Sequence, residues 1–279
     1  MPFAQAAGAK LYFEDTGAGD PIVFAHEFGG DYRSWNDQVR ALSRRYRCIT
    51  FNARGFPPSE VPESDDAYGY EHAAADMAAV MRHLAIPRAH IVGLSMGGYA
   101  ALVFAMRYPG MVSAMVVAGC GSGSDPSARA AYVAEIPARA ERLLAAGIAL
   151  KVEESSKDPT RVQLRRKDAK GWEEFLRYMG EQSVVGSALT LRNVQGKRPA
   201  LHEFENALRR LTIPVLVVVG DEDEHCILPS LYLKRTIPDA GLWMVPWTGH
   251  AVNLEEPTAF NHVLLDFFTC AQQRAALAG

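Results

Sequence analysis

The sequence has few cysteines and spaces them far apart. Only four of the 279 residues are cysteines, and no two of them form a C-x-x-C pair, which argues against a zinc ribbon or a dithiol redox motif. None of the four follows a helix-start signal of the kind that activates a thiolate, so a cysteine nucleophile is disfavoured. Three lie in or beside apolar runs, which predicts buried free thiols in a reducing compartment: Cys48, Cys120 and Cys226.

The sequence also lacks long apolar runs and any excess of basic residues. No apolar stretch approaches the roughly 18 residues of a membrane span, and residues 1–10 lack the charged flank and apolar segment of a secretory signal. The net charge is −3, and lysines and arginines are scattered, which argues against a nucleic-acid surface. We therefore expect a soluble, cytoplasmic protein that binds a small molecule rather than nucleic acid or membrane.

Short apolar runs that alternate with helical patterns are present along most of the chain. At 48% hydrophobic residues, the chain is long enough for one large core. The first two runs are separated by the turn residues 16–20, which predicts a hairpin. The alternation predicts an α/β fold with a mostly parallel sheet covered on both faces. The expected strands are 11–14, 21–25, 47–51, 90–93, 111–119, 215–219 and 242–245, and the expected core helices are 71–84, 95–108 and 258–268.

The pattern changes between about residues 124 and 206, where the valine-rich runs disappear. Helical stretches replace them at 128–146, 151–156, 172–183 and 201–210. We expect a core made of residues 1–123 and 207–279, with residues 124–206 inserted as a helical cap. Aromatic and apolar residues of this segment either line a pocket or pack the cap itself: Tyr132, Trp172, Phe175, Tyr178 and Met179.

The most informative motif is Gly93-Leu94-Ser95-Met96-Gly97-Gly98, between an expected strand and an expected helix. A serine between small residues at such a junction is typical of a nucleophile elbow. Glycines at 93 and 97 would relieve the backbone clash of a very sharp turn. The motif predicts Ser95 as a nucleophile for hydrolysis or acyl transfer. A glycine-rich turn with a surface serine is the alternative, since the pattern recurs by chance.

A serine nucleophile needs a base, and the base needs an orienting acid. His250 follows the last expected strand, so it lies at the edge of the sheet where open α/β sheets build their sites. His72, His83 and His262 fall in helical patterns and fit packing or surface roles better. The acid is ambiguous, because residues 221–224 are four consecutive carboxylates that also fit an acidic surface turn. A divalent metal site is disfavoured there, since the spacing of metal ligands is absent.

Taken in chain order, Ser95, Asp223 and His250 resemble the catalytic triad of the α/β-hydrolase superfamily. The resemblance covers nearly the whole chain outside the insertion and implies an eight-stranded, mostly parallel sheet with a helical cap. It selects Asp223 over Asp221, because the acid typically lies three residues beyond the glycine; Asp125 is a lesser candidate. The other motifs that carry it are His26-Glu27-Phe28-Gly29-Gly30, Arg54-Gly55 with Ser59, Gly220-x-x-Asp223 and Gly249-His250.

The resemblance also implies an oxyanion hole and a class of substrate. The backbone N–H groups of Phe28 and Met96 would hold the oxyanion, and no cofactor or metal would be needed. A carboxylesterase-like serine hydrolase of small-to-medium esters is the favoured activity. Lactonase, carbon–carbon bond hydrolase, acyltransferase and cofactor-free perhydrolase share the same constellation, and a triad-retaining small-molecule receptor is the non-enzymatic alternative.

The chain departs from the family pattern at two places. Glu27 stands where members commonly have glycine, and a carboxylate aimed into the hole would oppose the developing negative charge. We expect its side chain to point outward; the alternative is that it relays protons or binds a cationic group of the substrate. The loop 52–59 carries Pro57-Pro58, which stiffens it. Phe28, Met96 and Trp247 are expected to line the pocket, because each neighbours a candidate catalytic position.

Overall fold

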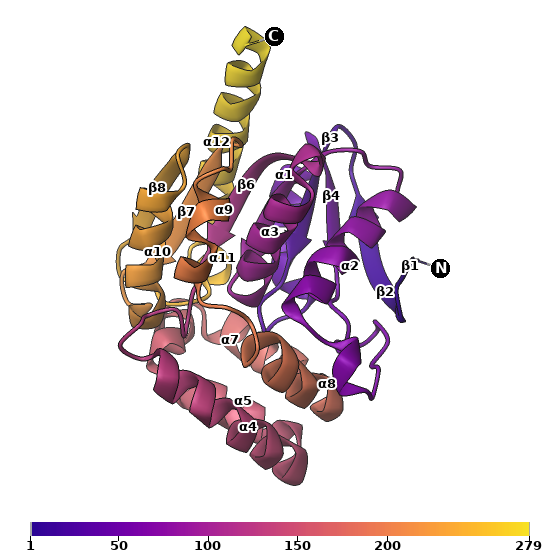
Figure 1. The fold of residues 1–279 in the computed structure, drawn as a ribbon, viewed down its shortest axis with the longest axis vertical. Coiled ribbons are helices and arrows are strands. Elements are labelled where there is room, and N and C mark those ends of the chain that lie inside the picture. Colours follow the sequence, from indigo (N-terminus) through magenta and orange to yellow (C-terminus); the bar gives the residue numbers. More distant parts are fainter. Residues whose placement is uncertain (1, 279) are drawn as a thin grey trace.

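The computed structural model describes residues 2–278 and contains one eight-stranded sheet (Figure 1). The strand order is β1-β2-β4-β3-β5-β6-β7-β8. The pairs from β4 to β8 are parallel, whereas β1 with β2 and β2 with β4 are antiparallel. The strands are β1 (Phe3–Ala6), β2 (Ala9–Thr16), β3 (Asp20–Ala25), β4 (Tyr46–Phe51), β5 (Ala89–Leu94), β6 (Val112–Ala118), β7 (Val215–Gly220) and β8 (Ala240–Val245).

The expected hairpin between residues 11–14 and 21–25 is wrong. β4 lies between β2 and β3, so these two strands are not paired. The hairpin partner of β2 is instead β1, a strand that the sequence pattern did not reveal, and Gly8 makes the turn with a φ of 77°. Glycine-rich turn residues at 16–20 permit a reversal of the chain but do not decide which strand becomes the neighbour.

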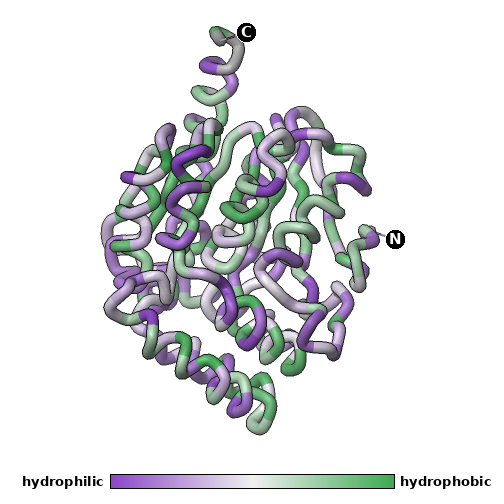
Figure 2. The backbone as a smooth tube through the Cα atoms, in the orientation of Figure 1, coloured by the Kyte–Doolittle hydropathy of each residue, from purple (hydrophilic) through white to green (hydrophobic). Residues whose placement is uncertain are grey.

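Helices cover both faces of the sheet, as expected. Along β3 and β5, Val23 and Ile91 face one core, whereas Ile22 and Val92 face the other. This alternation follows from the two-residue period of a strand. The first core includes residues of α2 (Tyr70–His83), α3 (Met96–Arg107) and α10 (Glu224–Thr236). The second includes residues of α1 (Asn36–Leu42) and α12 (Pro257–Ala278). In Figure 2 the central strands are mainly green, which marks hydrophobic residues.

The chain between β6 and β7 is helical, and within the described residues it contains no strand. Most of its helices gather at one end of the sheet (Figure 1) and have small apolar cores of their own. The last of them, residues 205–208, instead packs against α10 and adds Leu208 to the first core of the sheet. They include α4 (Arg129–Ala146), α5 (Ile148–Lys157), α6 (Val162–Lys167), α7 (Ala169–Gly180), α8 (Val184–Leu189) and α9 (Glu205–Leu208). Across residues 2–278, no helix has both the length and the apolar character needed to cross a membrane.

Candidate active site

Ser95 lies in a sharp turn between β5 and α3. Its backbone has φ 55° and ψ −111°, a conformation that costs free energy in any residue other than glycine. The turn is possible because two neighbours lack a Cβ: at Gly93 such an atom would lie 2.3 Å from the Gly97 carbonyl oxygen, and at Gly97 it would lie 2.0 Å from that of Ala25. The strained turn leaves Ser95 half-buried at the carboxyl edge of the sheet.

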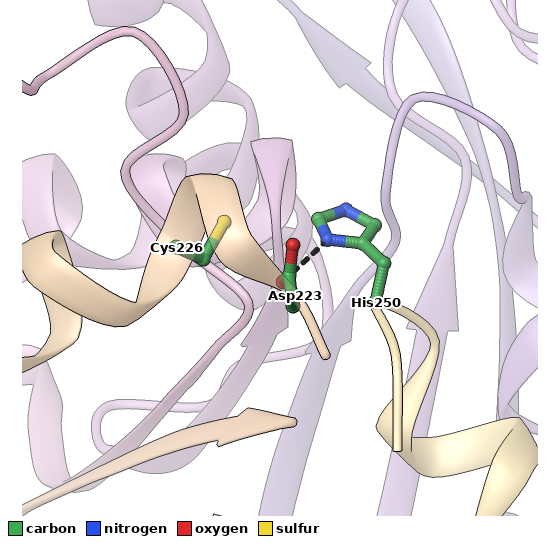
Figure 3. Close-up of side chains that lie close together, drawn as sticks. All are labelled: Asp223, Cys226 and His250. Carbon is green, nitrogen blue, oxygen red and sulfur yellow. Dashed lines mark hydrogen bonds and ion pairs between the residues drawn. The ribbon is translucent and has the colours of Figure 1, made fainter. Parts of the chain in front are cut away.

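His250 and Asp223 form a buried pair at the same edge (Figure 3). The His250 Nδ1 atom lies 2.8 Å from Asp223 Oδ2. Asp223 immediately precedes α10, whereas His250 follows β8. Burial alone would lower the pKa of His250, but the Asp223 carboxylate outweighs it and raises this pKa well above 6.5. Burial likewise raises the pKa of Asp223, and the charge of His250 outweighs it so that the net shift is downward.

The two other candidate acids lie elsewhere. Asp221 is exposed and accepts a hydrogen bond from a backbone N–H of the loop before His250, at Thr248. Asp125 accepts hydrogen bonds from Ser127 within its own turn. The structure therefore places Asp223 against the imidazole, as the resemblance implied.

The backbone beside Ser95 runs directly past the His250–Asp223 pair. The Ser95 N–H donates a 2.7 Å hydrogen bond to the Ala118 carbonyl. At the next residue, Gly119, a Cβ would lie 3.3 Å from both Asp223 Oδ2 and His250 Nδ1. Among the described residues no hydrogen bond joins Ser95 Oγ to His250 Nε2. Such contacts are often long in ligand-free enzymes and tighten with substrate bound.

Glu27 points inward, so the expectation of an outward side chain is wrong. It is 1% exposed, and both of its carboxylate oxygens bind the Arg161 guanidinium, which comes from the helical segment after β6. Its Oε2 atom lies 3.9 Å from His250 Nε2. Burial would raise the pKa of Glu27, but Arg161 outweighs it and lowers this pKa to about 2. A partner 134 residues away thus makes the buried carboxylate affordable.

The loop after β3 presents a polarised peptide where the oxyanion donor is expected. In the described part of the chain, neither the Phe28 N–H nor the Met96 N–H donates to another protein group. The carbonyl of the Glu27–Phe28 peptide accepts a 2.7 Å hydrogen bond from His26 Nδ1. His26 Nε2 accepts from the Ala53 N–H at 3.0 Å, so its ring proton lies on Nδ1. His26 therefore strengthens the Phe28 N–H as a donor, a role the sequence pattern did not reveal.

A buried lysine holds this loop from the other side. Lys151 on α5 donates to the Phe28 carbonyl at 2.8 Å, to Gln182 Oε1 at 2.6 Å and to Ser187 Oγ at 3.1 Å. Its Nζ also lies 3.6 Å from the centre of the Phe28 ring. Burial lowers its pKa well below 10.5. Lys151 was missed because it lies within an ordinary helical pattern and its partners are distant in sequence.

A small apolar cavity of about 30 Å³ adjoins the elbow. Met96 lines it as expected, together with Phe56 and Thr190. The Thr190 hydroxyl is buried and has no hydrogen-bond partner among the described residues. Trp247 does not line this cavity and is 73% exposed, so the expectation for it is wrong. Trp247 lies two residues beyond the end of β8 and has a positive φ of 52°. Phe28 does not line this cavity either, contrary to expectation; its ring packs edge-on against Phe56.

Three buried residues could in principle hold a metal ion. Donor atoms of Asp223, Cys226 and His250 all lie within 4.8 Å of one another, and Figure 3 shows the three side chains side by side. Each already has a protein partner, since the Cys226 thiol donates to the Gly119 carbonyl at 3.2 Å. Burial raises the pKa of that thiol, which disfavours the thiolate that a metal would need. The contacts fit a hydrogen-bonded support for the imidazole better than a metal centre.

The fold and this constellation define the class of protein. Residues 20–257 match the family described as alpha/beta hydrolase fold, so the chain belongs to that family and is a hydrolase of the α/β fold.

Among relatives, the chain is 30% identical to a protein from Mycobacterium tuberculosis provisionally named non-heme bromoperoxidase BpoC, over 93% of this chain and 97% of that protein. It is 27% identical to a protein from Agrobacterium fabrum provisionally named carbamate hydrolase RutD, over 94% of this chain and 100% of that protein. Among solved structures it is similar to the enol-lactonase from Burkholderia xenovorans, with a TM-score of 0.82 at 21% identity over 96% and 100% of the two chains.

Proposed function

We propose that this protein is a serine hydrolase that cleaves a small-to-medium carboxylic ester through an acyl-enzyme intermediate. The observation that carries the proposal is the buried 2.8 Å pair of His250 and Asp223, packed against the backbone that binds the strained Ser95 turn. A base with its acid beside a half-buried, sterically strained serine is the arrangement that nucleophilic acyl transfer requires.

In the proposed mechanism, His250 Nε2 takes the proton of the Ser95 hydroxyl while the oxygen attacks the acyl carbon. Asp223 keeps the other ring proton on Nδ1 and stabilises the imidazolium that forms. The imidazolium then gives its proton to the leaving alcohol as the carbon–oxygen bond breaks. Water, deprotonated by the same nitrogen, releases the acid and restores Ser95.

The backbone N–H groups of Phe28 and Met96 would hold the oxyanion. Both are free in the described part of the chain, and His26 and Lys151 fix the loop that carries Phe28. A single donor of this kind is typically worth about 2.7–4 kcal/mol of transition-state stabilisation.

The mainly apolar cavity wall beside Met96 supports an uncharged acyl group rather than a charged one. In this proposal residues 124–206 act as a cap over the core formed by residues 1–123 and 207–279. Contacts of Lys151 and Arg161 with the loop after β3 support that arrangement, since they bring the inserted helices over the expected reaction centre.

A second candidate is cofactor-free perhydrolysis, in which hydrogen peroxide instead of water attacks the acyl-enzyme. The 30% identity with the protein provisionally named as a non-heme bromoperoxidase favours testing it. The two activities share the acyl-enzyme and differ in the second nucleophile, so peroxy-acid formation at matched ester concentrations separates them.

The test is hydrolysis of p-nitrophenyl esters of increasing acyl length by the wild type and Ser95→Ala. We expect a preference for short acyl chains and a loss of about 10⁴-fold or more in kcat for the variant. Asp223→Asn should be severely impaired, whereas Asp221→Asn, its matched control on the same loop, should retain activity. Equal rates for wild type and Ser95→Ala would refute the nucleophile. A protein that reacts slowly with a single equivalent of ester, without further turnover, and whose Tm rises when a ligand binds would instead be a receptor.

A further inference from the structure

The imidazole of His250 has a carboxylate facing each of its two nitrogens. Asp223 Oδ2 lies 2.8 Å from Nδ1, and Glu27 Oε2 lies 3.9 Å from Nε2. Both carboxylates are 1% exposed. The mechanism above uses the first carboxylate and leaves the second, on the reactive side of the ring, without a role.

Glu27 is held in place by the inserted helical segment. The Arg161 guanidinium binds both carboxylate oxygens and lies over the Phe175 ring, 5.1 Å from its centre. The preceding residue, Thr160, accepts a 2.8 Å hydrogen bond from the His250 backbone N–H. One short stretch of chain therefore fixes the carboxylate and the histidine relative to each other.

The charged and titratable groups around His250 come from several elements. Asp223 and Cys226 face it from the start of α10, and Glu27 faces it from the loop after β3. Glu255 of α11 (Val252–Glu255) binds the backbone N–H groups of the residues on either side, Gly249 and Ala251. Arg161 is the cation among these groups, and both of its terminal nitrogens are engaged by Glu27. The ring therefore lies in a predominantly negative environment.

We propose that Glu27, clamped by Arg161, is a positioning residue that stabilises the imidazolium of His250 from its Nε2 side. The proposal rests on the function proposed above. When the Ser95 O–H bond breaks, its proton bonds to Nε2 and the oxygen lone pair forms the new bond to the acyl carbon. The Nε2–H then lies opposite the Glu27 carboxylate until the leaving group takes the proton. Glu27 itself accepts no proton at any step.

With Glu27 charged, His250 is a stronger base, and its imidazole stays protonated up to a higher pH than it would without Glu27. Asp223 is the main group that raises the pKa of His250, and the Glu27 carboxylate, 3.9 Å from Nε2, would act in the same direction from the other side of the ring. Removing the Glu27 charge should lower that pKa, because an opposite charge within about 4–6 Å typically shifts a pKa by one unit or more. The acid limb of the pH–rate profile would then move to lower pH in Glu27→Gln.

The test is an NMR titration of His250 in a Ser95→Ala background, where no turnover occurs, with the resonance assigned by its loss in His250→Gln. We expect Glu27→Gln to lower the midpoint by about one pH unit or more. Glu181→Gln is the matched control, because Glu181 pairs with Arg33 rather than with the site. It should leave the midpoint unchanged. In the protein with Ser95 intact, kcat/KM for p-nitrophenyl acetate should show the same shift.

An unchanged His250 midpoint in Glu27→Gln would overturn the proposal. A role confined to folding would alter Tm and leave the midpoint where it is. If Glu27→Gln fails to fold, Glu27→Asp gives the second measurement: its shorter side chain retreats from Nε2, so a smaller downward shift is expected and no shift refutes the idea. The titration does not depend on catalysis, so failure of Ser95 as the nucleophile would be recognised separately.

Discussion

The carbonyl oxygen of Thr160 accepts a 2.8 Å hydrogen bond from the backbone N–H of His250. The first residue belongs to the helical segment inserted after β6 and the second to the loop after β8. The same carbonyl would lie 1.9 Å from a Cβ at Gly249. The inserted segment therefore packs directly against the backbone that carries the candidate base.

Gly249→Ala should impair both stability and activity, because the added methyl group cannot fit against the Thr160 carbonyl without a backbone shift. We expect a loss of about 1–3 kcal/mol in the free energy of unfolding, measured with urea. Gly110→Ala is the matched control, since a Cβ there meets nothing within 4 Å. If Gly249→Ala were as stable and as active as Gly110→Ala, the tight contact would be wrong.

Lys151→Met should reduce kcat/KM for short esters by about tenfold or more, because it leaves the Phe28 carbonyl without its donor and loosens the candidate oxyanion loop. Circular dichroism would establish the folded fraction before rates are compared. Lys170→Met, at an exposed position of α7, serves as the control. A rate within twofold of the wild type would show that the loop does not need Lys151.

Thr190→Val should stabilise the protein by about 1 kcal/mol, since it replaces a buried hydroxyl that has no partner among the described residues with a methyl group of similar size. Thr160→Val is the contrasting variant, because that hydroxyl donates to Asp158 at 2.8 Å and its loss should destabilise. Thermal denaturation of both variants checks the signs. A destabilised Thr190→Val would mean that the hydroxyl does have a partner.

Glu27 should make folding stability depend on pH. Its pKa is about 2 in the folded protein against an ordinary 4.5. A depressed carboxyl pKa contributes stability above pH 4.5 that is lost as the pH falls towards 2, in total about 3 kcal/mol. The difference in unfolding free energy between wild type and Glu27→Gln should therefore narrow from pH 5 to pH 3. A difference that stays constant over this range would contradict the lowered pKa.

Local sequence patterns predicted much of the fold and part of the site. Short-range patterns predicted three elements: the valine run predicted β7, the helical period predicted α2, and the glycines around Ser95 predicted the sharp turn. Strand composition, helix periodicity and turn sterics each depend on residues close together in the sequence. The place of His250 after the last expected strand indicated the base, whereas Asp223 was selected only by the resemblance to the α/β-hydrolase superfamily; the structure brings the two side chains to 2.8 Å. The neighbours of β2 were not predictable in this way. They depend on the position of β4, which lies between β2 and β3 although it comes after both in the sequence.

The sequence by itself determined an α/β sheet with a sharp serine turn at its carboxyl edge, because the strands, the helices and the turn each depend on residues that are neighbours in the sequence. Only the tertiary structure decided that Glu27 is buried against Arg161 and that Lys151 braces the loop of Phe28. A buried charge is stable only with a partner in contact, and these partners lie more than 100 residues along the chain. No local sequence pattern predicts which distant side chain will contact Glu27 or the Phe28 carbonyl once the helices have packed.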